Sequence, residues 1–115
     1  MTHDMKLTHE PFAMIKDGTK TIELRLYDEK RRNIKVGDRI VFTDTVSGEK
    51  MEVSVSDLYI FDSFATLYKK LPLLECGYAE ADIDTASPDD MDLYYTREAQ
   101  AKYGVVGIRV EVCHG

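Results

Sequence analysis

The sequence lacks several residue types and patterns that mark particular protein classes. It has no tryptophan and only two cysteines, and Cys76 and Cys113 form no C-x-x-C pair. Two cysteines are too few for a disulfide framework, so we expect a reduced, cytoplasmic protein, although the sequence leaves their pairing in space open. No apolar run reaches the ~18 residues of a membrane span, and the first residues lack the layout of a secretory signal. We expect no membrane partner.

Motifs of the common cofactor-dependent enzymes are absent as well. The three histidines stand at no metal-binding spacing, and there is no Cys/His cluster. Neither a glycine-rich phosphate loop nor a Gly-x-Ser-x-Gly motif occurs. We therefore expect no metal site and no cofactor.

The overall composition is that of a globular protein. Hydrophobic residues make up 43% of the chain and charged residues 31%, which is too apolar for a disordered protein. A chain of 115 residues is long enough for one hydrophobic core but not for two domains. We expect residues 1–115 to form a single domain.

Hydrophobic periodicity and turn residues predict a series of short elements. Strands are expected near residues 5–7, 21–26, 39–45, 51–60 and 105–112, and helices near 11–18, 63–71 and 96–103. Ser87 followed by Pro88 predicts a further helix start, and residues 73–86 read as loop with some helix. No strand–helix unit repeats, which argues against a doubly wound parallel sheet. The order predicts an α+β domain around a small, curved antiparallel sheet or barrel.

The densest polar group lies in residues 18–25, Gly-Thr-Lys-Thr-Ile-Glu-Leu-Arg. Strand alternation places Glu23 and Arg25 on one side, with Lys20 at the strand entrance, while the alternating apolar residues face the core. Two cations and a carboxylate can bind a phosphate or a base edge, and a lysine beside a carboxylate can act as a base. The alternative is a solvated strand face whose charges serve solubility.

This motif, Gly-x-Lys-x-x-Glu-x-Arg after a short Pro-Phe helix, resembles the signature of the ASCH domain family of the PUA-like superfamily. Residues 35–38, Lys-Val-Gly-Asp, resemble the family's turn before its next strand, and residues 95–98 and 103–108 resemble the ending of small bacterial members. The resemblance covers nearly the whole chain. It implies a PUA-like small antiparallel β-barrel with inserted helices, and a cleft between barrel and helices that the motif lines.

The resemblance also implies a function, because family members are thought to bind RNA or nucleotides in that cleft. The candidate ligand-binding residues are Gly18, Lys20, Thr21, Glu23, Arg25, Arg32 and Tyr95. Some small members are amidohydrolases that act on N4-acylated cytidine with a lysine, a hydroxyl residue and a glutamate. On that pattern Lys20 activates the nucleophile, Glu23 stands at the hydroxyl position, and Glu75 is the candidate glutamate of the helical segment.

Three kinds of function stay open at this point: a binding module, an amidohydrolase, and an interaction domain whose acidic half binds a protein. Position 23 separates the first two, because a carboxylate cannot act as a hydroxyl nucleophile would. The glutamate there favours binding of a nucleotide, a modified nucleoside or a short single strand of RNA.

The charge distribution limits the size of such a ligand. The net charge is −6, but residues 16–39 hold eight Lys/Arg and five Asp/Glu, whereas residues 75–98 hold one arginine and eight acidic residues. The basic region suits a small anionic ligand, and the acidic region repels the phosphates of a long duplex. We expect no binding to long duplex DNA. The oligomeric state is not determined by these patterns.

Overall fold

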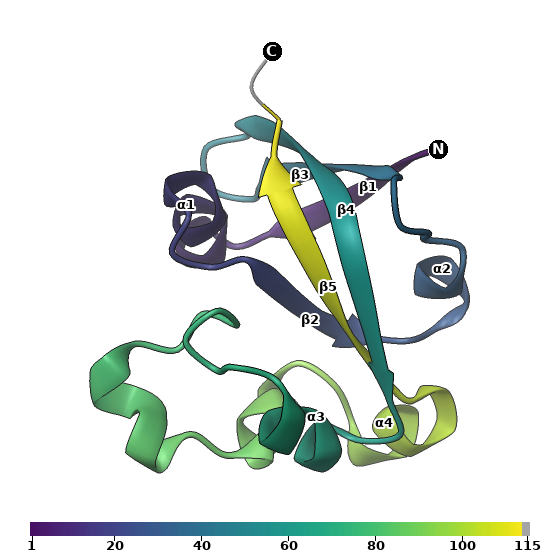
Figure 1. The fold of residues 1–115 in the computed structure, drawn as a ribbon, viewed down its shortest axis with the longest axis vertical. Coiled ribbons are helices and arrows are strands. Elements are labelled where there is room, and N and C mark those ends of the chain that lie inside the picture. Colours follow the sequence, from purple (N-terminus) through teal and green to yellow (C-terminus); the bar gives the residue numbers. More distant parts are fainter. Residues whose placement is uncertain (114–115) are drawn as a thin grey trace.

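The computed structural model describes residues 1–113, and Figure 1 shows their path. Along the chain the elements are β1 (Thr2–Leu7), α1 (His9–Asp17), β2 (Ile22–Leu26), α2 (Glu29–Arg32), β3 (Arg39–Asp44), β4 (Lys50–Phe61), α3 (Phe64–Lys70), the 3-10 helices η1 (Glu80–Thr85) and η2 (Pro88–Leu93), α4 (Arg97–Tyr103) and β5 (Val105–Val112). The strands and helices predicted from periodicity are therefore confirmed, with bounds that differ by a few residues.

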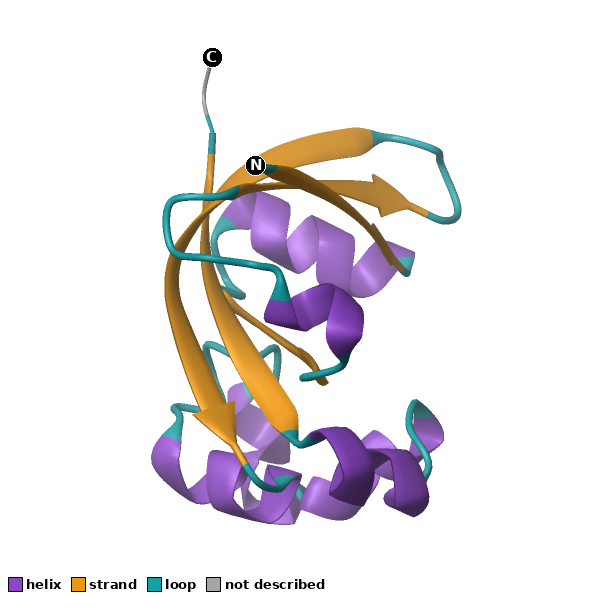
Figure 2. Ribbon diagram, turned by 90° about the vertical axis from the view of Figure 1, so that its right-hand side faces the viewer, coloured by secondary structure: helices purple, strands orange, loops and turns teal. Residues whose placement is uncertain are grey.

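The strands form one sheet in the order β1-β3-β4-β5-β2, with β1 and β2 as its edges. The pairs β3–β4, β4–β5 and β2–β5 are antiparallel, as predicted, but β1 pairs with β3 in parallel. A parallel pair needs a long crossover, and the chain between β1 and β3 supplies one through α1, β2 and α2. Figure 2 shows the sheet curling strongly around α1 and α2.

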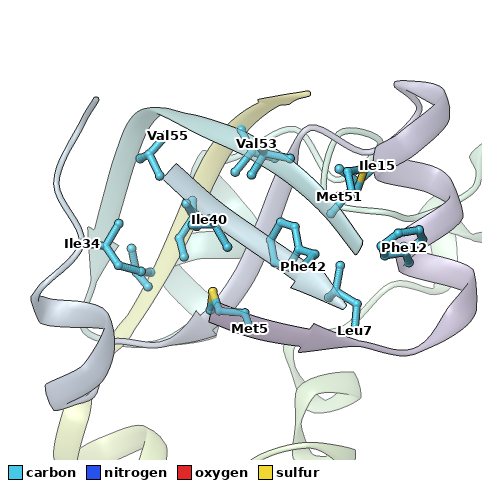
Figure 3. Close-up of a cluster of buried hydrophobic side chains, with 13 residues drawn as sticks. Met5, Leu7, Phe12, Ile15, Ile34, Ile40, Phe42, Met51, Val53 and Val55 are labelled. Atoms are coloured by element: carbon cyan, nitrogen blue, oxygen red, sulfur yellow. The ribbon is translucent and has the colours of Figure 1, made fainter. Parts of the chain in front are cut away.

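A first hydrophobic cluster fills the inside of this curl. Phe12 and Ile15 of α1 lie on one helix face at the i, i+3 spacing that the sequence predicts, and both are 2% exposed. They belong to one cluster with alternate residues of the strands, which include Ile40, Phe42 and Val53 (Figure 3). This burial holds α1, and with it the loop before β2, against the sheet.

A second cluster lies between the sheet and the helical layer formed by α3, η2 and α4. It contains Ile22, Leu24 and Leu26 of β2 together with Phe64 and Leu67 of α3. The layer comes very close to the sheet at Gly107 of β5, where a Cβ atom would lie 2.7 Å from Leu71 Cδ1. Glycine at this position leaves room for the Leu71 side chain, which would have to move if a Cβ atom were present.

Strand β2 lies between the two clusters, which decides where its polar side chains go. The three apolar residues pack under the helical layer as predicted. On the opposite face Glu23 is only 5% exposed and Lys20 before the strand only 8%, so neither side chain is solvated. The alternative of a solvated strand face is therefore wrong for these two residues.

Candidate ligand-binding pocket

The centre of the candidate site is a carboxylate held by two cations. Lys20 Nζ donates to Glu23 Oε1 at 2.7 Å, and Arg25 Nε donates to Glu23 Oε2 at 2.9 Å. The period of two residues in β2 puts Glu23 and Arg25 on the same face, and the turn after α1 brings Lys20 beside them. The three residues therefore form one charged group, which the motif predicts.

Burial and charge act in opposite directions on Glu23. Burial alone raises the pKa of this carboxyl, but Lys20 and Arg25 outweigh that effect and hold the pKa below its usual range. Glu23 is therefore ionised at neutral pH. Since one carboxylate faces two cations, the group retains a positive charge for an anionic or electron-rich ligand.

Arg25 also joins the two free edges of the sheet. Its Nη2 atom donates to the backbone oxygen of Lys6 in β1 at 2.8 Å, while the same guanidinium holds Glu23 of β2. Within residues 1–113, neither Arg25 Nη1 nor the remaining N–H groups of Lys20 have a hydrogen-bond partner. These donors are available to a ligand.

A pocket of about 520 Å³ opens beside this group, between β1, α1, β2 and the segment that follows α3. Lys20, Glu23 and Arg25 line it on the sheet side. Side chains of the helical side include Tyr68, Tyr78, Asp90, Met91 and Tyr95. In Figure 1, β2 runs between α1 and the helical layer. The cleft between barrel and helices that the family resemblance implies therefore has a counterpart in this pocket.

Aromatic side chains form much of the helical side. The Tyr95 ring stacks on Phe64 with centroids 6.2 Å apart and an angle of 18° between the planes. The Tyr68 and Tyr78 hydroxyls are 2.6 Å apart, and Tyr78 donates to Asp90 Oδ2 at 2.8 Å. Burial raises the pKa of Tyr95, and burial together with the bonds to Tyr68 and Asp90 raises that of Tyr78. Both hydroxyls are therefore protonated at neutral pH.

The backbone at Gly77 passes directly over Lys20. Gly77 has a φ of +106°, and a Cβ atom there would lie 3.2 Å from Lys20 Cδ. Both the backbone conformation and the close approach favour glycine. The absence of a side chain at this position leaves room for Lys20 in the pocket wall.

The structure brings four of the predicted ligand-binding residues together and places the others elsewhere. Lys20, Glu23, Arg25 and Tyr95 line the pocket. Gly18 ends α1 in the left-handed conformation, with a φ of 87°, and is not part of the pocket lining.

Thr21 and Glu75 form a separate group. The Thr21 hydroxyl donates to Glu75 Oε1 at 2.9 Å, and Arg109 Nη1 donates to the same oxygen at 2.8 Å. Neither Thr21 nor Glu75 lines the pocket. The Arg109 and Thr21 hydrogen bonds lower the pKa of Glu75.

Arg32 lies apart from both groups. Its guanidinium stacks over the Tyr27 ring at 4.4 Å, and its Nη2 donates to the Tyr103 backbone oxygen at 3.1 Å. The basic segment after β2 therefore contributes none of its side chains to the pocket lining.

Sequence reasoning missed the residues that line the pocket from distant parts of the chain. Lys6, Tyr68, Tyr78 and Asp90 belong to segments that carry no motif. The one local signal was Ser87 followed by Pro88, since Ser87 and Asp90 form a capping box that fixes the position of Asp90.

Three further findings concern metal ligands, helix length and the cysteines. Residues 1–113 contain no group of three or more His, Cys, Asp or Glu side chains that could hold a metal ion. No helix in this part of the chain is long and apolar enough to cross a membrane. Cys76 and Cys113 are both free.

Comparison with known proteins identifies the family. The family model of the ASCH domain matches residues 5–114. The chain belongs to the ASCH domain family. No curated protein matches this ASCH domain.

Two solved structures are similar to it along their full lengths. One is the crystal structure of the hypothetical protein PH0355, with 35% identity, a TM-score of 0.79 and coverage of 98% of this chain and 100% of that chain. The other is the solution structure of protein PF0455 from Pyrococcus furiosus, with 36% identity, a TM-score of 0.77 and full coverage of both chains.

A more distant ASCH protein confirms the fold. The crystal structure of a mutant ASCH protein from Zymomonas mobilis has 14% identity and a TM-score of 0.65, and the match covers 95% of this chain and 68% of that chain. The predicted α+β class with a PUA-like fold is therefore confirmed, with the sheet as an open, curled half-barrel.

Proposed function

We propose that this ASCH domain binds a nucleotide, a modified nucleoside or a short single strand of RNA in the pocket around Lys20, Glu23 and Arg25. The observation that carries the proposal is the pair of cations on Glu23, Lys20 buried and Arg25 partly buried, both with unused donors, inside a pocket lined in part by aromatic rings. Small-molecule sites have volumes of roughly 300–1,000 Å³. The pocket of about 520 Å³ is within this range.

The proposed contacts follow from the chemistry of each wall. Arg25 offers a planar fork and Lys20 a compact ammonium, and both suit a phosphate oxygen or a base acceptor. Tyr95 has one ring face backed by Phe64. A nucleobase that stacks against the pocket side of such a ring gains about 1–3 kcal/mol.

The amidohydrolase alternative receives less support from the same contacts. Within residues 1–113 the hydrogen-bond partner of Lys20 Nζ is Glu23, and the nearby Thr21 hydroxyl donates to Glu75 instead. Cys76 lines the pocket, but burial raises the pKa of its thiol to about 11, so it is a poor nucleophile at neutral pH. Binding therefore remains the better supported function.

Titration calorimetry with nucleoside monophosphates and short single-stranded RNA tests the proposal. Arg25→Lys keeps the charge but loses the fork, and Lys20→Met removes the ammonium while Glu23 stays paired with Arg25. We expect each variant to weaken binding about tenfold or more, because hydrogen bonds to charged groups contribute about 1.5–3 kcal/mol.

The control is Lys69→Ala, which removes an exposed lysine at the end of α3. It should leave binding unchanged. The proposal fails if the wild-type protein has no measurable affinity for any of these ligands, or if the pocket variants bind as tightly as the wild type. Release of acetate from N4-acetylcytidine, abolished by Lys20→Met, would favour the amidohydrolase instead.

A further inference from the structure

The two sides of the pocket differ in hydrogen-bonding character. We call Lys20 and Arg25 the donor wall and Tyr68, Tyr78 and Asp90 the acceptor wall; all five line the same pocket. On the donor wall, both oxygens of Glu23 already accept from the cations. Lysine and arginine have no acceptor atom, so Lys20 and Arg25 can only donate hydrogen bonds to a ligand.

The proton positions on the acceptor wall follow from its hydrogen bonds. Asp90 Oδ2 accepts from the Tyr78 hydroxyl at 2.8 Å and from the Ser87 backbone N–H at 3.2 Å. A tyrosine has a single hydroxyl proton, and Tyr78 uses it on Asp90. The contact of 2.6 Å between the two hydroxyls must therefore be Tyr68 donating to Tyr78.

These hydrogen bonds use both tyrosine hydroxyl protons of the acceptor wall and leave oxygen atoms that can still accept. Within the described residues Asp90 Oδ1 accepts no hydrogen bond, and it is not among the buried atoms that lack a partner, so it is accessible. The Tyr68 oxygen also keeps lone pairs. A ligand that meets this wall must bring a donor.

The two walls line one pocket and come close to each other at Gly77. Gly77 precedes Tyr78 directly, and a Cβ atom at Gly77 would lie 3.7 Å from Lys20 Nζ. The loop that carries Tyr78 thus passes over the end of the donor wall. A planar ring in the pocket can face donors on one edge and acceptors on another.

We infer that Asp90 determines specificity by accepting a hydrogen bond from an exocyclic amino group of the bound base, while the donor wall contacts the base's acceptors. The inference rests on the proposed function. Adenine and cytosine carry an amino group beside a ring acceptor. In hypoxanthine and uracil a carbonyl oxygen takes the place of the amino group, which would set two acceptors against each other at Asp90.

Titration calorimetry with matched ligand pairs tests this inference. The pairs are the 5′-monophosphates of cytidine and uridine, and those of adenosine and inosine, which differ at the amino position. We expect the wild-type protein to bind the amino member of each pair about tenfold more tightly than the keto member, because the site's acceptor stays unpaired with the keto base.

Asp90→Asn provides the sharper test. In this variant the amide oxygen takes the place of Oδ2 and accepts from Tyr78 and Ser87, because the amide nitrogen cannot accept. The amide NH₂ group therefore takes the place of the accessible Oδ1 and donates. We expect the preference to reverse toward the keto member, with an unchanged thermal midpoint. Asp84→Asn, at an exposed position of η1, should keep the wild-type preference.

Each outcome decides between the two proposals. If none of the four monophosphates and no short RNA binds, the proposed function fails. If they bind with equal affinity within each pair, the proposed function stands and the inference about Asp90 is overturned. Equal weakening of both members by Asp90→Asn would also overturn it, because a merely structural role of Asp90 predicts that result.

Discussion

Glu23 is a buried carboxylate whose two oxygens are each bound by a different cation. Each partner of such a group offsets part of the desolvation cost of the others, and a cation that loses its carboxylate loses this compensation. Lys20 and Glu23 are both nearly inaccessible, so solvent cannot replace the missing partner. The stability of the fold and the geometry of the pocket therefore depend on the same residue.

At the residue scale we predict that Glu23→Ala lowers the free energy of unfolding by about 3–5 kcal/mol, the usual cost of breaking a buried charge pair. Urea denaturation followed by circular dichroism measures this change. Glu52→Ala is the matched control, because Glu52 pairs with Arg39 at 2.7 Å while both side chains are 49% exposed.

An exposed pair of this kind contributes about 0–1 kcal/mol. The Glu52 variant should therefore unfold close to the wild-type urea concentration. Similar losses for the two glutamate variants would contradict the view that burial makes Glu23 critical.

At the element scale, the loop over residues 73–78 is attached to the start of β2. The Glu75 backbone oxygen accepts from the N–H groups of Thr21 and Ile22, both at 2.9 Å. The Glu75 side chain adds the bonds to Thr21 and Arg109. These contacts position Gly77 and the residues beside it, which close the pocket over Lys20. Glu75 thus lies where it can position the loop.

We predict that Glu75→Ala loosens this attachment without unfolding the domain. Loss of the side-chain hydrogen bonds should cost about 1 kcal/mol locally, which corresponds to roughly fivefold faster amide exchange in the loop and at Thr21 and Ile22. Hydrogen exchange followed by mass spectrometry measures it. Glu80→Ala, at an exposed position of the same segment, is the control and should leave exchange in the loop unchanged. Unaltered exchange in the Glu75 variant would show that the backbone bonds alone hold the loop.

The elements themselves were predictable because their signals are local. The alternation in residues 21–26 reflects burial of every second side chain of β2 under the helical layer, and this pattern is visible without any partner strand. Ser63 and Ser87 cap the helical turns that follow them, as residues of their type do. The parallel pairing of β1 with β3 has no such local signal, because it depends on how the intervening chain crosses over.

At the scale of the whole molecule, two histidine–aspartate contacts tie the N-terminal segment to the ends of β3. His3 Nε2 lies 2.8 Å from Asp38 Oδ2, and His9 Nδ1 lies 2.7 Å from Asp44 Oδ2. The His3 contact lowers the pKa of Asp38 to about 2, and the His9 contact lowers that of Asp44 to about 2. Both carboxyls ordinarily titrate near 3.8.

We predict from these shifts that the domain loses stability in acid. Because the folded-state pKa values lie below the ordinary ones, the unfolded state binds protons first as the pH falls. The stabilisation is complete above about pH 5 and is lost as the pH falls from there through 2. Urea midpoints measured between pH 7 and pH 2 should show this fall.

The double variant Asp38→Asn with Asp44→Asn should flatten the pH dependence in that range, because its side chains do not titrate. Asp84→Asn, which changes an exposed aspartate, should follow the wild-type curve. A double variant with the same steep loss below pH 5 would show that other carboxyls control acid unfolding.

The sequence by itself determined the order of strands and helices, the family and the charged motif, because each depends on residues that are neighbours along the chain. The spacing of Lys20, Glu23 and Arg25 allowed the prediction that their charged groups converge, and the contacts on Glu23 agree with it. The net charge of −6 still allowed a small ligand at the basic region, and two cations of that region, Lys20 and Arg25, line the pocket.

Only the tertiary structure decided what surrounds that motif. Alternating charges on β2 look the same on a solvent-facing strand and on one packed between two hydrophobic clusters, so the burial of Glu23 depended on the curl of the sheet. Long-range packing likewise decided that Glu75 binds Arg109 and that Arg32 stacks on Tyr27. It also placed Tyr78 and Asp90 in the pocket lining. Side chains far apart in sequence meet through folding of the whole chain, and no local pattern records where they meet.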